Sequence, residues 1–261
     1  MIDLHCHLLP GIDDGARDLE TSLEMARVAV ADGIRVTACT PHIQPGVFDN
    51  RAEDIRAGVV ALQKALNDAG IPLTLVVGCD AHVRHDFVPA LRNRQLVSLH
   101  DTRYVLFEPP HHVVPPRMED LLFDILAAGY VPILTHPERL TWIAPQFEML
   151  RRLSRSGVWM QITSGSVTGR FGRGPQELAE RMLGEGMVHI LATDAHSTRR
   201  RPPLLREGME AAAKIVGEEE ARHMVDTRPR IVLENSVSTV APKAPVRQEK
   251  RGLFARIFAR S

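Results

Sequence analysis

The sequence has few cysteines, no excess of charge of either sign and no long apolar run, and each shortage excludes a class of protein. Only three cysteines occur in 261 residues, too few for the disulfide framework of a small secreted protein and typical of a reducing compartment. Lys and Arg total 32, as do Asp and Glu, so the chain lacks the positive charge of a dedicated nucleic-acid binder. No apolar stretch approaches the roughly 18 residues of a membrane span. The N-terminal MIDLHCHLLPGIDDG lacks the basic segment and apolar core of a signal peptide. We therefore expect a cytoplasmic protein with no nucleic-acid partner.

Familiar catalytic signatures are absent as well. No Gly-Lys-Ser/Thr phosphate loop and no dinucleotide-binding glycine pattern occurs. His5 and Cys6 are similar to the start of the loop of cysteine-dependent phosphatases, but that loop needs an arginine six residues after the cysteine, where this chain has Ile12. We therefore expect no thiolate nucleophile. Cys39 and Cys79 lie in apolar segments and are interpreted as small core residues.

The composition is that of a globular protein, and its pattern alternates strands with helices. Hydrophobic residues make up 44% and charged residues 25%, and the length suits one large domain. Short β-branched runs predict strands at Ile2–His5, Val36–Thr40, Leu73–Gly78, Tyr104–Phe107, Pro132–Thr135, Val158–Gln161 and His189–Ala192. Amphipathic stretches predict helices at Leu19–Ala31, Ala52–Ala69, Met118–Ala128, Pro145–Arg155, Pro175–Gly184 and Leu204–Val216. This alternation predicts βαβ units, a parallel sheet and a closed barrel.

Polar side chains recur at the predicted strand ends, and their rhythm indicates a shared site. His5, His42, Asp80, Glu108, His136, Gln161 and Asp194 follow one another at intervals of 25 to 38 residues. One βα unit needs roughly 30 residues, so a barrel would gather these side chains around its C-terminal rim, where barrel enzymes keep their chemistry.

The local motifs at these positions favour a metal site. His5 and His7 are two residues apart, so on an extended strand both face one side, and Asp194 and His196 repeat this arrangement. Asp13 and Asp14 follow in a glycine-bounded loop. One His-x-His is a weak signal, but five histidines and four carboxylates in register are not. Such mixed ligation suits manganese, iron or zinc. The remaining histidines have no such register and are assigned to the surface or to supporting positions.

Five segments together resemble a known family. DLHCHLLPGIDDG, TPH, THPER, QITSGSVTGRFG and TDAHS resemble the PHP superfamily, and in their order the manganese-dependent protein-tyrosine phosphatases of bacterial capsule and exopolysaccharide operons. The resemblance covers residues 1–236. It implies a distorted (β/α)₇ barrel, in agreement with the seven predicted strands. It also implies up to three ions at the C-terminal rim, with manganese first and iron or zinc as alternatives.

The resemblance also implies roles for individual residues. His5, His7 and Asp194 would hold one ion, Asp80 would bridge it to a second that also takes Glu108 and His136, and Asp14, His42 and His196 would hold the third. Arg139 in THPER matches the phosphate-facing arginine of the family. Arg201, directly before two prolines, is the implied second, with Arg199 and Arg200 as adjacent alternatives.

Position 80 departs from the family pattern. Relatives usually carry Glu there, whereas this chain has Asp80. An aspartate is one methylene shorter, so a bridge between two ions would need a backbone shift or closer ions. His82, two residues on, is placed to assist.

The function that the resemblance implies is hydrolysis of protein phosphotyrosine, on a membrane-associated tyrosine kinase that regulates capsular or exopolysaccharide synthesis. The chemistry agrees, because a phenolate with a parent pKa of about 10 leaves more easily than an alkoxide. One alternative is a PHP phosphatase for a small molecule such as histidinol phosphate. Another is a non-catalytic metal-binding regulatory module. A PHP nuclease is disfavoured by the neutral net charge.

The composition changes after residue 236. Residues 237–261 contain the Pro-rich APKAPVRQEK and then GLFARIFARS, with six basic residues against one acidic residue from position 241 on. We interpret them as a linker and a basic amphipathic tail. The tail predicts peripheral contact with the inner face of the membrane, and docking on the barrel or on another subunit is the alternative.

Overall fold

The computed structural model describes residues 1–244 of the chain. The strands are β1 (Ile2–Cys6), β2 (Val36–Cys39), β3 (His42–Ile43), β4 (Thr74–Val77), β5 (Asp80–His82), β6 (Tyr104–Glu108), β7 (Val131–Thr135), β8 (Trp159–Thr163) and β9 (Ile190–Ala192). The helices are α1 (Leu19–Asp32), α2 (Ala52–Asp68), α3 (Phe87–Arg92), α4 (Met118–Ala127), α5 (Phe147–Arg155), α6 (Ser164–Val167), α7 (Arg173–Gly184), α8 (Arg206–Val216), α9 (Glu218–Arg222) and α10 (Arg228–Leu233). Short 3₁₀ turns lie at Leu99–Asp101, Pro137–Arg139 and Ala144–Gln146, and a π turn at His223–Thr227.

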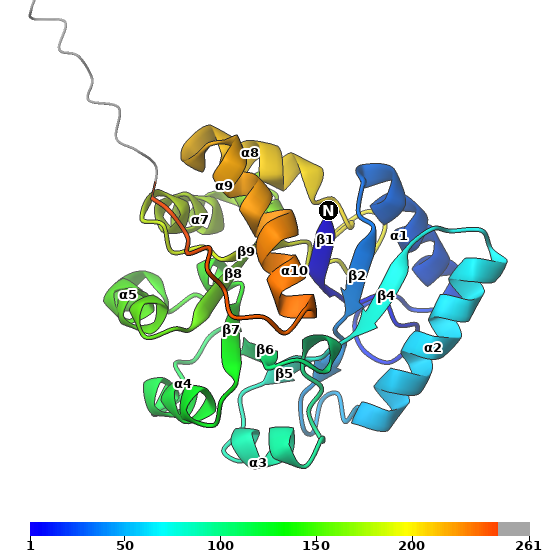
Figure 1. Ribbon diagram of the computed structural model, residues 1–261, viewed down its shortest axis with the longest axis horizontal. Helices are drawn as coiled ribbons and strands as arrows, with labels where there is room; N and C mark the ends of the chain where they lie inside the picture. Colours follow the sequence, from blue (N-terminus) through cyan, green and yellow to red (C-terminus); the bar gives the residue numbers. More distant parts are fainter. Residues whose placement is uncertain (245–261) are drawn as a thin grey trace, which may run out of the picture.

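The strands form two parallel sheets that together outline a distorted barrel (Figure 1). One sheet has the order β1-β2-β4 and the other β3-β5-β6-β7-β8-β9. β3 and β5 follow closely on β2 and β4 but lie just beyond the predicted strands Val36–Thr40 and Leu73–Gly78, so these two short strands were not predicted. β9 and β1 are joined by few contacts: a bridge between Cys6 and Ala195, and a hydrogen bond of 2.8 Å from the Asp194 N–H to the His5 carbonyl. Among the described residues, strand pairing is therefore not continuous around the barrel, and in this sense the barrel is distorted.

The core explains why the strands read as apolar runs. β1, β6 and β8 are buried at every residue, as expected for parallel strands covered on both faces. The helices cover the outside of the barrel (Figure 1). α1 begins where Asp18 accepts a hydrogen bond of 2.8 Å from the Thr21 N–H and ends at Gly33, whose φ of 97° suits glycine.

The predicted fold class is confirmed, since parallel strands alternate with helices and the arrangement agrees with a distorted barrel. The closed barrel that the alternation predicted does not form among the described residues, because the strands divide into two sheets. The predicted strands and helices match within a few residues at their ends. The short helices α3, α6, α9 and α10 were not predicted, because segments of four to six residues are too short to show a helical period.

The end of the described chain packs across the starts of the strands. Tyr104, the first residue of β6, donates a hydrogen bond of 2.7 Å from its hydroxyl to the Ser236 carbonyl. The buried Arg228 donates to the carbonyls of Val240 and Ala241 at 3.0 and 3.1 Å, and to Glu220 Oε1 at 2.6 Å. The division at 236/237 stays a prediction, and the predicted tail helix lies outside the described residues. Within residues 1–244 no helix combines the length and apolar character needed to cross a membrane.

Candidate metal centre

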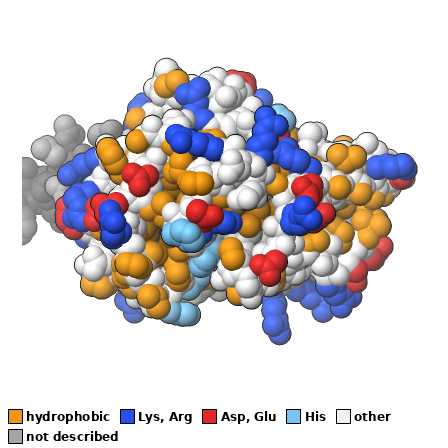
Figure 2. Space-filling model, turned by 90° about the horizontal axis from the view of Figure 1, so that it is seen from below, with side chains coloured by type: hydrophobic (Ala, Val, Ile, Leu, Met, Phe, Trp, Pro, Cys, Tyr) orange, Lys and Arg blue, Asp and Glu red, His pale blue; other side chains and the backbone are white. Residues whose placement is uncertain are grey.

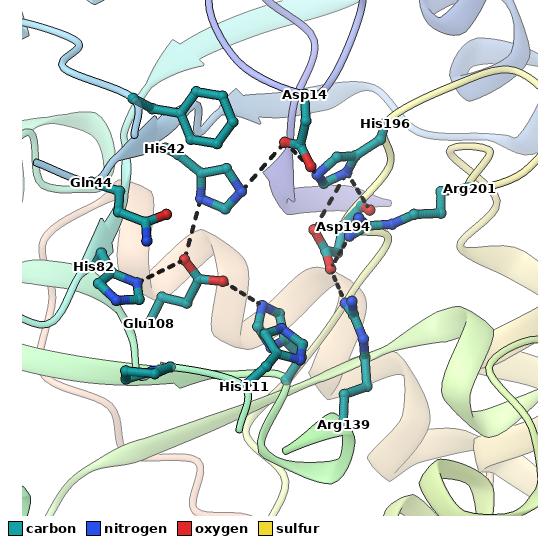
Figure 3. A pocket seen from close by; sticks show the side chains of 13 residues that line it. Asp14, His42, Gln44, His82, Glu108, His111, Arg139, Asp194, His196 and Arg201 are labelled. Atoms are coloured by element: carbon teal, nitrogen blue, oxygen red, sulfur yellow. Dashed lines mark hydrogen bonds and ion pairs between the residues drawn. The ribbon is translucent and has the colours of Figure 1, made fainter. Parts of the chain in front are cut away.

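All nine predicted ligands meet at the C-terminal ends of the strands. They surround or lie directly beneath a cavity of about 420 Å³ whose lining includes Asp14, His42, Glu108, His136, Asp194 and His196 (Figure 3). His5, His7 and Asp80 lie buried below them. The side chains come from β1 and the loop after it, from the first residues of the short strands β3 and β5, from the end of β6, and from the segments after β7 and β9.

His5, His7 and Asp194 form the first group. The Nε2 atoms of the two histidines are 3.2 Å apart, and Asp194 Oδ1 lies 3.3 Å from the first and 3.5 Å from the second. Atoms that share an ion at about 2.1 Å are separated by about 3.0–3.4 Å in tetrahedral or octahedral geometry. The spacing of the three donors therefore fits one shared ion.

Two residues orient these histidines from behind. Gln161 Oε1 lies 2.8 Å from His5 Nδ1, and Asp13 Oδ2 lies 2.7 Å from His7 Nδ1. An acceptor at Nδ1 places the N–H there and leaves the lone pair of Nε2 free to bind a metal. Gln161 was predicted at the rim, and the structure gives it this supporting place.

Asp80 connects the first group to a second. Its Oδ2 lies 3.3 Å from His5 Nε2 and 3.6 Å from His42 Nδ1. Glu108 places one oxygen 3.2 Å from His42 Nδ1 and the other 3.6 Å from His136 Nε2. Asp80 therefore reaches both neighbouring groups despite its short side chain.

Asp14, His42 and His196 form the third group, with His7 beside them. Asp14 Oδ1 lies 3.5 Å from His42 Nε2 and 3.3 Å from His196 Nε2. His42 therefore turns one nitrogen to this group and the other to Glu108 (Figure 3). The third predicted group thus comes together with His7 added. The other groups differ in part from the prediction, because Asp80 and Glu108 gather with His42, whereas His136 gathers with His5 and Asp194 or with Glu108 and His111. The assignment of particular ions to particular residues stays a prediction.

Unsatisfied polar atoms test whether metal ions fit here. Both oxygens of Asp80, Nδ1 of His42 and Nε2 of His196 are buried without a hydrogen-bond partner among the described residues. Burying such groups unpaired is costly, above all for a carboxylate. Positive ions between them would satisfy these atoms at once, so the donor set fits a cluster of divalent cations.

The electrostatics of the cluster point the same way. Burial lowers the pKa of His5, but the charges of Asp194 and Asp80 outweigh it and raise the pKa to about 9. Burial also lowers the pKa of His42, and its close contacts with the carboxylates of Asp14 and Glu108 outweigh this and raise it to about 11. The cluster attracts positive charge to its centre, and divalent ions would compete with these protons.

Two arginines close one side of the cavity. Arg139 Nη1 and Arg201 Nη2 both donate to Asp194 Oδ2, the second at 2.5 Å. Arg199 and Arg200 are exposed and do not line the cavity. The structure thus brings Arg201, rather than its two neighbours, to the site.

The cavity also contains residues that the sequence did not single out. Gln44, Phe48, Pro110 and His111 contribute to its lining. His111 joins Glu108 and His136 in a group whose donor atoms lie within 4.8 Å of one another. It lies on a loop after β6, three residues beyond the rim position, where strand periodicity gives no signal. Histidine side chains also gather on one face of the molecule (Figure 2).

Comparisons with known proteins agree with this geometry. The family described as capsular polysaccharide synthesis, CpsB/CapC, matches residues 1–234. The tyrosine-protein phosphatase YwqE of Bacillus subtilis is 37% identical over 250 residues, which cover 96% of this chain and 98% of the relative. The tyrosine-protein phosphatase CpsB of Streptococcus pneumoniae is 26% identical over 238 residues, which cover 89% and 98%.

Solved structures give the same picture. A structure from the pair YwqE of Bacillus subtilis and CpsB of Streptococcus pneumoniae, described as unique metal-dependent tyrosine phosphatases, matches with a TM-score of 0.89 and 37% identity. The match covers 95% of this chain and all of that one. The histidinol phosphate phosphatase of Lactococcus lactis matches with a TM-score of 0.56 and 15% identity, over 82% of this chain and 92% of that one. The second likeness concerns the fold alone.

Proposed function

Because the chain belongs to the CpsB/CapC family of capsular polysaccharide synthesis, we propose that it is a metal-dependent phosphatase that hydrolyses phosphotyrosine in proteins. The observation that carries the proposal is the cavity itself, in which nine metal-ligand side chains and two arginines converge. Its near relative YwqE is named a tyrosine-protein phosphatase and is similar over almost the whole length of both chains.

The proposed ligands are those that the sequence indicated. His5, His7, Asp14, His42, Asp80, Glu108, His136, Asp194 and His196 would hold up to three ions, with manganese favoured by the mixture of imidazole and carboxylate donors. Ions bound here would make a hydroxide nucleophile available near neutral pH and would offset the charge of the phosphoryl oxygens. The orphaned buried atoms of Asp80, His42 and His196 support this assignment.

The chain's own residues would bind and orient the phosphate. The guanidinium groups of Arg139 and Arg201 lie at the edge of the cavity, where their N–H donors can meet phosphoryl oxygens as negative charge moves toward the leaving group. Asp194 holds both of them through one oxygen, which keeps them beside the ligand cluster. Gln161 and Asp13 keep His5 and His7 in the tautomer that faces the cavity.

A phosphotyrosine ester suits a site with no dedicated strong acid. The parent pKa of a phenol is about 10, so a phenolate departs without full protonation. No cysteine can serve as the nucleophile instead, because Cys6 is buried and burial raises the pKa of its thiol well above the usual value.

We further propose a cytoplasmic enzyme whose substrate is a membrane-associated tyrosine kinase of capsule or exopolysaccharide synthesis. The family description supports the polysaccharide context. The basic and apolar residues of 245–261 support peripheral contact with an anionic membrane. Co-sedimentation with anionic liposomes at low and high salt, comparing the full chain with one ending at Val240, tests this contact. Equal pelleting of the two proteins would contradict it.

The activity is tested on the full chain loaded with manganese. We expect a phosphotyrosine peptide to be hydrolysed faster than the matching phosphoserine peptide, histidinol phosphate or a single-stranded oligonucleotide. Faster turnover of histidinol phosphate would favour a small-molecule phosphatase. Stoichiometric metal binding without turnover of any of them would favour a regulatory module.

A further inference from the structure

The two arginines share a third partner besides Asp194. Phe171 lies beneath them, with its ring centroid 4.5 Å from Cζ of Arg139 and 6.0 Å from Cζ of Arg201. The ring is half-buried and lies on the turn that follows α6. A guanidinium bound face-on to an aromatic ring keeps its in-plane N–H donors free. Phe171 therefore contacts both arginines without competing with a phosphate for their hydrogen bonds.

Gly165 leaves the room that the Phe171 ring occupies. A Cβ atom on Gly165 would lie 2.8 Å from Cε2 of Phe171, so any larger residue at 165 would displace the ring. The Arg170 N–H donates to the Gly165 carbonyl at 2.7 Å, which folds the turn back over α6. The ring thus lies between α6 on one side and the two arginines on the other.

The same turn is tied to the segment that carries Arg139. The buried Glu138 accepts hydrogen bonds through Oε1 from the Thr163 N–H at 2.8 Å and from the Ser166 hydroxyl at 2.7 Å. Glu138 and Arg139 are neighbours in the chain, so THPER holds α6 with one side chain and meets Phe171 with the next. The motifs THPER and QITSGSVTGRFG are therefore joined to each other by the hydrogen bonds of Glu138.

The segment that carries Arg201 is tied to α6 as well. The Ser164 hydroxyl donates a hydrogen bond of 2.7 Å to the Leu204 carbonyl, three residues beyond Arg201. Gly208 packs so closely on Ser164 that a Cβ at position 208 would lie 2.2 Å from its Oγ. Both arginine-bearing segments are therefore fastened to α6, directly beside the Phe171 ring.

We infer that Phe171 is a positioning residue for phosphate recognition, holding Arg139 and Arg201 side by side through its ring face. The inference rests on the proposed phosphatase function and adds a residue to it. Two long cationic side chains repel each other and lose rotamer freedom when they are held together. A ring face attracts both guanidinium groups without adding a negative charge, so it offsets these costs and neutralises none of the positive charge that Asp194 leaves for an anion.

The inference is tested with Phe171→Ala, Phe171→Leu and Phe171→Tyr in the manganese-loaded full chain. The readouts are the inhibition constant of inorganic phosphate, kcat and KM for a phosphotyrosine peptide, and metal content. A cation–π contact of ordinary strength predicts phosphate binding weakened about 3- to 30-fold in the Ala and Leu variants. The Tyr variant, which keeps the ring face, should stay close to the parent. Metal content should not change, since a phenyl ring offers no donor atom to a metal ion.

Each outcome decides the matter. If Phe171→Leu binds phosphate as tightly as the parent, only the bulk of the side chain is needed. If Phe171→Ala does so, the side chain has no role in phosphate binding. Either result would overturn the inference. If the Ala variant does not fold, the comparison of Leu with Tyr still decides. Phe123→Ala is the matched control, because Phe123 is 66% exposed on α4. A parent that binds phosphate but hydrolyses another ester would refute the proposed substrate and leave the Phe171 comparison valid. A parent that binds no phosphate would refute both.

Discussion

Arg139 and Arg201 donate to the same atom, Oδ2 of Asp194, although they lie far apart in the chain. The other oxygen of Asp194 faces the two histidines of β1 at 3.3 and 3.5 Å. The carboxylate of Asp194 thus lies between the proposed metal ligands on one side of the cavity and the two arginines on the other. The burial of Asp194 raises its pKa, but Arg201 and His5 outweigh this and hold the pKa well below its usual range. It stays ionised and serves both sides.

One oxygen of Asp194 accepts from the arginines and the other faces the histidines, and this arrangement predicts the effect of removing Arg139. We expect Arg139→Ala to lower phosphate-ester turnover about 10²- to 10³-fold, the scale of losing one preorganised donor to the transition state. Metal content should be unchanged, because a guanidinium does not bind a cation. Elemental analysis beside steady-state kinetics checks both points. Joint loss of metal and activity would mean that Arg139 supports the ligand cluster instead.

A metal requirement follows from the ligand set. Dialysis against a chelator should abolish hydrolysis, and added manganese should restore it. Cys6→Ser should keep most of the turnover, because the thiol is buried and is held protonated by its raised pKa. Full activity after exhaustive chelation, or inactivation by the serine substitution alone with the metal retained, would contradict the mechanism.

Asp80 gives a prediction about side-chain length. Its Oδ2 already lies 3.3 Å from a nitrogen of one group and 3.6 Å from a nitrogen of the next, and its side chain is fully buried. We therefore expect Asp80→Glu to bind manganese no more tightly than the parent, since the extra methylene has to be accommodated in a packed site. Calorimetric titration of the metal-free proteins measures this. Tighter binding in the variant would show that Asp80 is too short for a bridge.

His189 predicts a loss of stability in acid. Burial and the charge of Arg228 lower its pKa to about 3, from an ordinary value of about 6.5. Between these pH values His189 is protonated in the unfolded chain but neutral in the folded chain. The free energy of unfolding therefore falls as the pH drops from about 6.5 toward 3. The slope approaches about 1.4 kcal/mol per pH unit well inside this window.

The matched variant is His189→Asn. Its side-chain oxygen can accept the hydrogen bond that His189 Nδ1 receives from the Met160 N–H at 3.1 Å, and it does not titrate. Urea unfolding at pH 7 and pH 5 with a chelator present should give a smaller pH-dependent loss in the variant. The same loss in both proteins would mean that His189 does not contribute to acid sensitivity.

The sequence predicted which side chains gather at the cavity better than it predicted their surroundings, and the reason is physical. Ligands at strand ends follow the βα repeat, so His5, Asp80 and Asp194 could be located by interval alone. Phe171 and His111 lie in turns whose paths depend on tertiary contacts. The packing of Gly165 on the Phe171 ring, for example, joins two parts of a turn that no periodicity relates. The short strand β5 was likewise not predicted, because its three residues Asp-Ala-His are too few and too polar to show a strand pattern.

The contacts of Arg228 and Tyr104 decide from which face the chain leaves the barrel. Both residues hold the segment 236–241 against the beginnings of the strands, and in Figure 1 this orange-red segment crosses the barrel beside α10. The proposed ligands lie at the opposite ends of the strands. A tether joined after residue 244 would therefore be attached at the N-terminal ends of the strands. It would leave the cavity at their C-terminal ends unobstructed. An immobilised or fused form of the protein should accept large substrates as readily as the free one.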